Sequence, residues 1–268
     1  QPDWEKAIEL EAELFLYSGK MAFKDNNYSE ALTWFDKIKR GNLKFDASVA
    51  AIMVLFEQKN YTEAYKWFLK AANQGSSAGQ YNLGFLYENG YGVQKNYTEA
   101  HKWYLKAASQ DYAVAQYSLA TLYAFGDGVQ KNYTEAYKWY LKAAEQGHAT
   151  AQHDLGITYA NGYGIQQDHA EAYKWFLKSA SQGSASAQNH VGNHYYYGNG
   201  VQQNYEKAHY WYLKAAKQGD FYAQYNVAAS YADGQGIPQN LLTAEKYYAL
   251  SAKQGHVYSN VQIGRLYS

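Results

Sequence analysis

The chain of 268 residues is 47% hydrophobic, enough to bury a sizeable core, and its 24 basic and 24 acidic residues leave no net charge. This balance argues against a nucleic-acid or anionic-membrane partner recognised through bulk charge. The absence of cysteine excludes disulfides, zinc–thiolate sites and thiol nucleophiles, and no run of about 18 apolar residues is available to span a membrane.

The first 74 residues predict two pairs of helices that lack Gly-x-Gly sequences, over 5–24 with 27–40 and over 45–58 with 60–74. Tyr28 and Tyr61 occupy equivalent places in these pairs and lie 33 residues apart, close to the period of tetratricopeptide units. No proline-rich or serine-rich linker follows. We therefore assign 1–74 to two tetratricopeptide-like pairs at the start of one continuous helical array.

From residue 75 the sequence repeats every 36 residues without gaps. The phrase GVQKNYTEAYKWYLKAAEQG at 128–147 returns, with small changes, 36 residues earlier and 36 residues later. Such self-similarity is typical of arrays in which each unit buries its apolar face against its neighbours. We assign 75–256 to five repeats and 257–268 to a final helix that forms a half-repeat or cap.

Each repeat predicts two helices joined by a Gly-x-Gly loop. The first covers segments such as 113–125, where four residues spaced three or four apart share one face: Gln116, Leu119, Ala120 and Tyr123. The glycines end this helix, because glycine tolerates left-handed backbone angles. Asn132 can then cap a second helix over roughly 133–146, in which Trp139 and Tyr140 are predicted to fill the space between neighbouring pairs.

The segment QYNLGFLYENGYGVQKNYTEAHKWYLKAASQ, which begins at Gln80, resembles the Sel1-like repeat family, a relative of tetratricopeptide repeats. The resemblance covers 77–268, with local departures at Asp111, Ala120, Ala228 and Ser259. It implies an all-α fold, a right-handed solenoid of stacked antiparallel helix pairs whose first helices line a concave groove. It also implies a role as adaptor or scaffold in protein complexes, and many bacterial members are exported.

The residue columns that vary between repeats mark a candidate protein-binding groove. Packing columns keep nearly one residue type, whereas other columns of the first helices change, and by the family's geometry these face the groove. The five first helices contain no Lys or Arg, while tyrosine and asparagine offer large contact areas and adaptable hydrogen bonds. The candidate groove residues are Tyr81, Phe85, Tyr117, Thr121, Phe125, His153, Ile157, Asn189, Asn193, Tyr196, Tyr197, Tyr222 and Tyr225.

Other kinds of site find little support in the sequence. It contains no P-loop, no HExxH and no G-x-S-x-G. His190 and His194 lie four residues apart and His153 precedes them by one repeat, but no acidic third metal ligand is evident. We therefore expect structural or groove-contact roles for these histidines and predict no catalytic residue, metal or cofactor. A groove without Lys or Arg cannot neutralise phosphates, which excludes nucleic acid as the partner.

The sequence therefore predicts a monomeric, non-enzymatic scaffold or adaptor that binds another protein or peptide in its groove. One alternative is an immunity-type inhibitor that neutralises a secreted toxic enzyme. A third interpretation is a hydrolase, because some Sel1-like proteins have been credited with penicillin-directed hydrolysis. Those proteins are rich in cysteine, whereas this chain has none.

The sequence also bears on where the protein works. The chain begins with Gln1 instead of Met, and the absence of cysteine is compatible with an oxidising compartment. Together with the family resemblance, these features predict a bacterial protein that is exported behind a signal peptide to the periplasm or the medium. A trimmed cytoplasmic protein is the alternative.

Overall fold

The computed structural model describes residues 60–266. The helices expected over 5–24, 27–40 and 45–58 lie outside the described residues.

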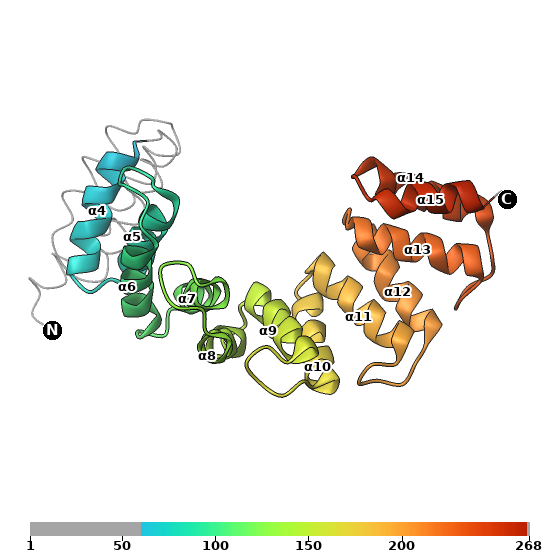
Figure 1. Cartoon of the computed structure of the whole chain (residues 1–268), viewed down its shortest axis with the longest axis horizontal. Helices are drawn as coiled ribbons and strands as arrows, with labels where there is room; N and C mark the ends of the chain where they lie inside the picture. Colours follow the sequence, from blue (N-terminus) through green and yellow to red (C-terminus); the bar gives the residue numbers. More distant parts are fainter. Residues whose placement is uncertain (1–59, 267–268) are drawn as a thin grey trace, which may run out of the picture. The chain divides into compact units, whose positions relative to one another are not determined.

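The chain divides into two compact units, unit 1 with residues 1–132 and unit 2 with residues 133–268. Within its described part, unit 1 contains α4 (Tyr61–Asn73), α5 (Ser77–Asn89), α6 (Tyr97–Ala108) and α7 (Ala113–Phe125) (Figure 1). Unit 2 contains α8 (Tyr133–Glu145), α9 (Ala149–Asn161), α10 (His169–Ser181), α11 (Ala185–Tyr197), α12 (Tyr205–Ala216), α13 (Phe221–Asp233), α14 (Leu241–Lys253) and α15 (Val257–Arg265). Consecutive helices pack in series within each unit, and residues 60–266 contain no strand. The prediction of an all-α solenoid of helix pairs is therefore confirmed.

The second helix of a repeat begins at a capping side chain. Asn96 Oδ1 accepts a hydrogen bond from the backbone N–H of Glu99 at 3.1 Å, and Asn204 Oδ1 accepts one from Lys207 at 2.8 Å. Each bond satisfies an amide that has no partner inside the helix. The capping predicted from the asparagine column is confirmed at these positions, and the helix predicted over 133–146 ends one residue earlier.

The Gly-x-Gly loop both ends the first helix and contacts the preceding repeat. Gly162 caps α9 with a φ of 71°, and Gly164 follows with a φ of 70°. A Cβ atom added to Gly164 would lie 2.5 Å from the backbone nitrogen of Thr134, at the start of α8. The Thr134 hydroxyl donates to the carbonyl of Gly164 at 3.1 Å. The second glycine therefore permits a close backbone contact between repeats.

In the helix pairs that lie within one unit, an aromatic ring of the second helix packs on a small residue of the first. A Cβ atom added to Gly84 would lie 2.7 Å from the Tyr104 ring, and one added to Gly192 would lie 2.5 Å from the Tyr212 ring. Both rings are buried. Since protein interiors are packed about as densely as organic crystals, this contact fixes the spacing of the two helices.

The tryptophan column lies beside these rings and is less uniformly buried. Tyr140 is buried, as predicted, whereas Trp139 is only half-buried and Lys142 Nζ lies 4.4 Å from its ring centroid. Trp175 at the equivalent place in α10 is buried. The prediction that Trp139 fills the core is thus only partly met, because its ring stays partly exposed, with the Lys142 ammonium beside it.

Candidate partner-binding face

The candidate residues of unit 1 lie on α5 and α7, and most of them pack within the unit. Tyr81 contacts the Tyr104 and Tyr112 rings with centroid distances of 5.5 and 5.6 Å, and burial raises its pKa. Phe85 lies 6.0 Å from the Tyr91 ring. Phe125 differs because it is 70% exposed, at the end of α7.

The other two candidates of unit 1 belong to one helix turn. Thr121 Oγ1 donates to the carbonyl of Tyr117 at 3.0 Å, and both side chains are half-buried. Sequence variation at these places therefore does not by itself mark an open surface. Of the five candidates in unit 1, Phe125 is the one with an exposed side chain.

In unit 2, the two candidate asparagines of α11 connect helices. Asn189 is buried, and its Oδ1 accepts a hydrogen bond from Asn226 Nδ2 on α13 at 2.9 Å. Asn193 Oδ1 accepts one from the Tyr212 hydroxyl on α12 at 2.8 Å. Asn189 was expected to line a groove, but it faces the next first helix and supplies a bond between repeats.

Aromatic candidates of unit 2 also lie at the end of α11. The Tyr196 ring is 4.9 Å from the Tyr197 ring and 5.3 Å from the Tyr205 ring, and burial raises the pKa of Tyr196. Tyr197 is 65% exposed. Ile157 on α9 packs against the core formed by α10 and α11. A partner could therefore reach Tyr197 more readily than the other two candidates.

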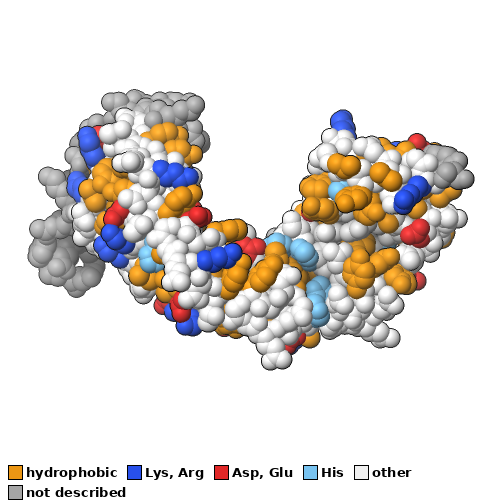
Figure 2. Space-filling view, viewed as in Figure 1, with side chains coloured by type: hydrophobic (Ala, Val, Ile, Leu, Met, Phe, Trp, Pro, Cys, Tyr) orange, Lys and Arg blue, Asp and Glu red, His pale blue; other side chains and the backbone are white. Residues whose placement is uncertain are grey.

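Three histidines and Phe176 form an imidazole cluster between α9, α10 and α11. The Phe176 and His190 rings stack with a centroid distance of 4.5 Å and an interplanar angle of 10°. His153 lies 5.3 Å from His190, and His194 lies 5.6 Å from Phe176. Figure 2 shows histidine side chains gathered over this part of unit 2. The sequence suggested that His153 and His190 are near each other, but it did not indicate the phenylalanine between them.

Two rings of the imidazole cluster form hydrogen bonds through their Nδ1 atoms. His194 Nδ1 donates to the carbonyl of Asn199 at 2.6 Å, and His153 Nδ1 bonds to Asp154 Oδ1 at 2.8 Å. Burial, together with the nearby His153 and His194, lowers the pKa of His190 to about 4. Within residues 60–266 no three His, Asp or Glu side chains are grouped so that they could hold a metal ion.

Tyr222 and Tyr225 belong to a larger group of rings, which we call the His256 cluster: Phe221, Tyr222, Tyr225, His256 and Tyr258. The His256 ring lies 5.6 Å from Tyr222, 4.9 Å from Tyr225 and 5.9 Å from Tyr258. Tyr222 is 55% exposed and Tyr258 is 71% exposed. The cluster joins the start of α13 to the start of α15 and presents aromatic surface to solvent.

Sequence reasoning missed the α15 half of the His256 cluster. Tyr258 lies 36 residues after Tyr222, in the same column, so the period could have extended the set into the half-repeat. The period gave no such signal for His256, because this residue lies just before α15 and outside the helix columns that were compared. Its Nδ1 bonds to Ser259 Oγ at 2.9 Å, within the first turn of α15.

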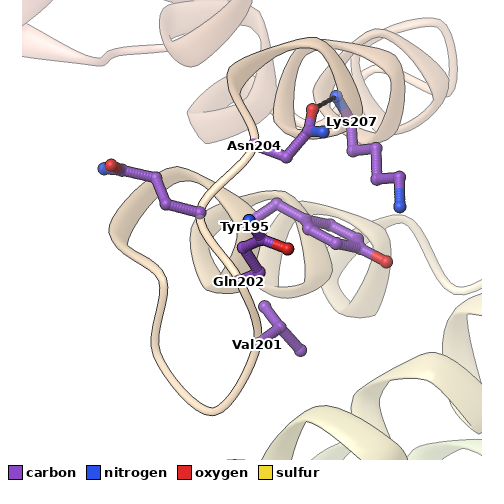
Figure 3. A pocket seen from close by; sticks show the side chains of 6 residues that line it. Tyr195, Val201, Gln202, Asn204 and Lys207 are labelled. Carbon is purple, nitrogen blue, oxygen red and sulfur yellow. Dashed lines mark hydrogen bonds between the residues drawn. The ribbon is translucent and has the colours of Figure 1, made fainter.

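A pocket of about 390 Å³ lies where the α11–α12 loop meets the start of α12 (Figure 3). Its polar groups have local structural roles, because Asn204 caps α12 at Lys207 and Lys207 Nζ lies 5.3 Å from the Tyr195 ring centroid. The pocket contains none of the candidate residues. No helix among residues 60–266 combines the length and apolar character needed to cross a bilayer.

Comparison with known proteins places these features in a family. The Sel1 repeat model matches seven segments: 12–42, 56–76, 77–112, 113–148, 149–184, 185–220 and 221–256. A Sel1 repeat protein from Oxalobacter formigenes is 38% identical over 78% of this chain and 86% of its own, with a TM-score of 0.74. The protein c5321, a protective antigen of uropathogenic Escherichia coli strains displaying an SLR fold, is 31% identical over 98% of this chain, with a TM-score of 0.86. This chain spans 58% of the length of c5321. No curated protein matches it.

Proposed function

Since this chain belongs to the Sel1 repeat family, whose members are generally protein-interaction scaffolds, we propose that it docks a partner protein on the His256 cluster of unit 2. The observation that carries this proposal is that Tyr222 and Tyr258 are both exposed and that the His256 ring contacts both of them. Members of this family typically bind proteins without catalysing a reaction, and the role proposed for this chain is of that kind.

The His256 cluster has the chemistry of a protein-binding surface. Tyrosine presents a broad apolar ring together with a hydroxyl that can hydrogen-bond, and it loses little conformational entropy when a partner covers it. Val257 on the same turn of α15 is 71% exposed and adds apolar area. In Figure 2, hydrophobic side chains gather over the region where α13 and α15 begin. Binding energy usually concentrates in a few such central anchors.

The charge distribution supports a partner that is held by aromatic and apolar contact and not by ionic attraction. The first helices α9, α11 and α13 contain no Lys or Arg, and their acidic residues are Asp154 and Asp233. On the second helices, Lys138 pairs with Glu135 at 2.6 Å and Lys174 pairs with Glu171 at 2.5 Å, whereas Lys142, Lys178 and Lys214 lie over tryptophan rings. The affinity of a partner on the His256 cluster should therefore depend only weakly on ionic strength.

We propose further that the protein works outside the cytoplasm. The related c5321 is a protective antigen, and the absence of cysteine in this chain is compatible with an oxidising compartment. Fractionation of the native cells tests the location. Recovery of the protein in the periplasm or the medium is expected, whereas recovery in the cytoplasm alone would contradict export.

The binding proposal is tested with the protein immobilised as bait in native extract, and captured proteins are identified by mass spectrometry. The binding constant of the purified partner is then measured for wild type and for Tyr222→Ala and Tyr258→Ala. Each substitution should weaken binding by about 1–3 kcal/mol, the usual loss when an aromatic anchor is truncated.

The matched control is Tyr210→Ala, because Tyr210 is 60% exposed on the second helix α12. It removes the same side chain from a different face and should leave the binding constant unchanged. A larger loss of affinity for Tyr210→Ala than for both cluster variants would place the interface on the second helices instead.

A further inference from the structure

We propose that Asn199 is a site of spontaneous deamidation, in which the backbone nitrogen of Gly200 attacks the side-chain amide of Asn199. Glycine favours this reaction because it has no Cβ atom to hinder the approach of its nitrogen. The sequence contains three Asn-Gly pairs: Asn89 with Gly90, Asn161 with Gly162, and Asn199 with Gly200. The structure sets the third pair apart from the other two. This proposal does not rest on the binding role of the His256 cluster.

The reaction releases ammonia and needs only water as a co-reactant. The Gly200 amide loses its proton to solvent base, and its nitrogen forms a bond to Cγ of Asn199. The bond from Cγ to Nδ2 breaks, and Nδ2 takes up a proton and leaves as ammonia. Water then opens the cyclic succinimide at one of its two carbonyl groups, which gives aspartate or isoaspartate. A susceptible pair therefore needs a free glycine N–H and a side-chain amide that can turn towards it.

Asn161 is protected because it is the last residue of α9. The N–H of Gly162 donates to the carbonyl of Thr158 at 2.9 Å, and Asn161 Nδ2 donates to the carbonyl of Ile157 at 2.9 Å. The reaction would have to break both bonds and open the end of the helix. Asn89 and its glycine form the two equivalent bonds, of 2.9 and 2.8 Å, at the end of α5.

Asn199 lies beyond the end of α11, in the middle of a Gly-x-Gly loop, and its side chain is exposed. Within the described residues, neither its side-chain amide nor the N–H of Gly200 has a hydrogen-bond partner. Both reacting groups are therefore available without the loss of a helix bond. The exposed position also admits the water and the base that the reaction uses.

The imidazole of His194 should make the Gly200 nitrogen more reactive. His194 Nδ1 donates to the carbonyl of Asn199 at 2.6 Å, and this carbonyl belongs to the same peptide group as the Gly200 nitrogen. When that nitrogen loses its proton, the negative charge is shared with the carbonyl oxygen. A hydrogen bond to the oxygen stabilises this charge, so it favours the form of the peptide group that attacks.

The loop around Asn199 also lacks a contact that holds the loop of the preceding repeat. The Thr134 hydroxyl donates to the carbonyl of Gly164 at 3.1 Å. Ala170 stands in the same column at the start of α10 and has no hydroxyl to donate to the carbonyl of Gly200. A loop held by fewer bonds opens more readily, and it should reach the geometry of attack more often.

The isoaspartate product should loosen the contact between two repeats. It adds one carbon atom to the backbone at residue 199, directly before Gly200. The fit there is tight, because a Cβ atom added to Gly200 would lie 2.5 Å from the carbonyl oxygen of His169. The longer backbone should therefore move the loop away from the start of α10.

The test incubates the 268-residue protein in mildly alkaline buffer and follows each Asn-Gly pair by mass spectrometry of its peptides. Asn89 and Asn161 are matched controls, because they have the same dipeptide in the same molecule. Asn199 should deamidate about tenfold faster than either of them. In urea the three rates should converge, because the fold no longer protects the helix ends. Equal rates in the folded protein, or a difference that persists in urea, would overturn the proposal.

Two variants test the structural causes. Ala170→Thr supplies the hydroxyl that Thr134 provides one repeat earlier, and it should slow the reaction of Asn199 about threefold. His194→Leu removes the imidazole and should also slow the reaction about threefold. This variant should fold, because the same column on α7 holds Leu122. An unchanged or faster reaction in either variant would overturn the role given to the residue that was replaced.

Thermal unfolding tests the effect of the product on the repeat contact. The isoaspartate form, isolated by chromatography, should have a lower midpoint than the fresh protein. Asn199→Asp is the control, because it carries the same negative charge without the extra backbone carbon, and it should unfold like the wild type. Equal midpoints for the isoaspartate form and the fresh protein would contradict a loosened contact.

Discussion

The Asn226 side-chain amide donates a 2.9 Å hydrogen bond to Asn189 Oδ1, and this bond joins two first helices that belong to successive repeats. His153 and His190 occupy the same two columns one repeat earlier, and their rings lie 5.3 Å apart. The variable columns therefore include pairs whose members must suit each other across a helix junction. Variation within a repeat array reflects the fit between neighbours as well as the surface offered to a partner.

Asn226→Ala should lower the free energy of unfolding by about 1–3 kcal/mol, because it leaves the buried Asn189 without its donor. Urea denaturation followed by circular dichroism measures the loss. Asn161→Ala is the matched control, because the Asn161 amide donates to Ile157 of its own helix and is exposed. A loss of equal size in both variants would mean that the bond between repeats adds no stability.

The protein should become less stable as the pH falls from about 6.5 towards 4. His190 has a folded-state pKa of about 4 against an ordinary value of 6.5, so in this window the unfolded chain binds a proton that the folded chain does not. The stabilisation is present above pH 6.5 and is lost as the pH drops to the folded pKa, for a total of up to about 3 kcal/mol.

His190→Asn isolates this effect, because α13 carries asparagine in the same column, at Asn226. Unfolding free energies measured from pH 4 to pH 8 should fall less steeply towards acid for the variant than for wild type. Parallel curves for the two proteins would show that the acid sensitivity has another origin.

Gly164→Ala should destabilise the protein more than Gly147→Ala. Both glycines have positive φ, so both variants bear about 1–2 kcal/mol of backbone strain. At Gly164 the new Cβ atom also meets the Thr134 backbone at 2.5 Å, whereas at Gly147 nothing lies within 4 Å. The clash should add about 1–3 kcal/mol. Thermal unfolding of the two variants compares their losses of stability. Equal losses would show that the contact between the loop and Thr134 does not stabilise the protein.

Tyr140→Ala should cost more stability than Trp139→Ala, although tryptophan is the larger residue. Tyr140 is buried, and deleting a buried aromatic side chain typically costs about 3–5 kcal/mol. Trp139 is half-buried beneath Lys142, so its truncation removes less buried area. Denaturant midpoints of the two variants decide the order, and the reverse order would show that the tryptophan column is the main packing element.

The fold follows closely from the sequence because its signals are repeated. Local backbone chemistry sets the helix bounds, such as Ala113–Phe125, together with the asparagine caps and the glycine ends. A single repeat contains these signals, and the other repeats support the same assignment. The close contact of Gly164 with Thr134 depends on how one repeat sits on the next, and no single repeat contains that information.

The candidate site was harder to predict, because a variable column does not reveal the direction of a side chain. Asn189 and Tyr225 stand in one column, yet Asn189 is buried in a junction and Tyr225 joins the rings around His256. The difference arises from the partners at Asn226 and Tyr248, which belong to other helices. The exposed Tyr258 was within reach of the 36-residue period, but it lies in the incomplete repeat.

The contact between the Gly-x-Gly loop and the previous repeat limits how the gene can change in length during evolution. Thr134 bonds to the Gly164 carbonyl 30 residues later, and Gly200 and Gly236 approach the starts of α10 and α12 in the same manner. A single codon inserted between Thr134 and Gly164 would move the glycine out of contact with Thr134. Unequal recombination that adds or removes a whole repeat keeps every such span intact. We therefore expect related genes to differ in length by multiples of one repeat, with loop lengths held constant between them.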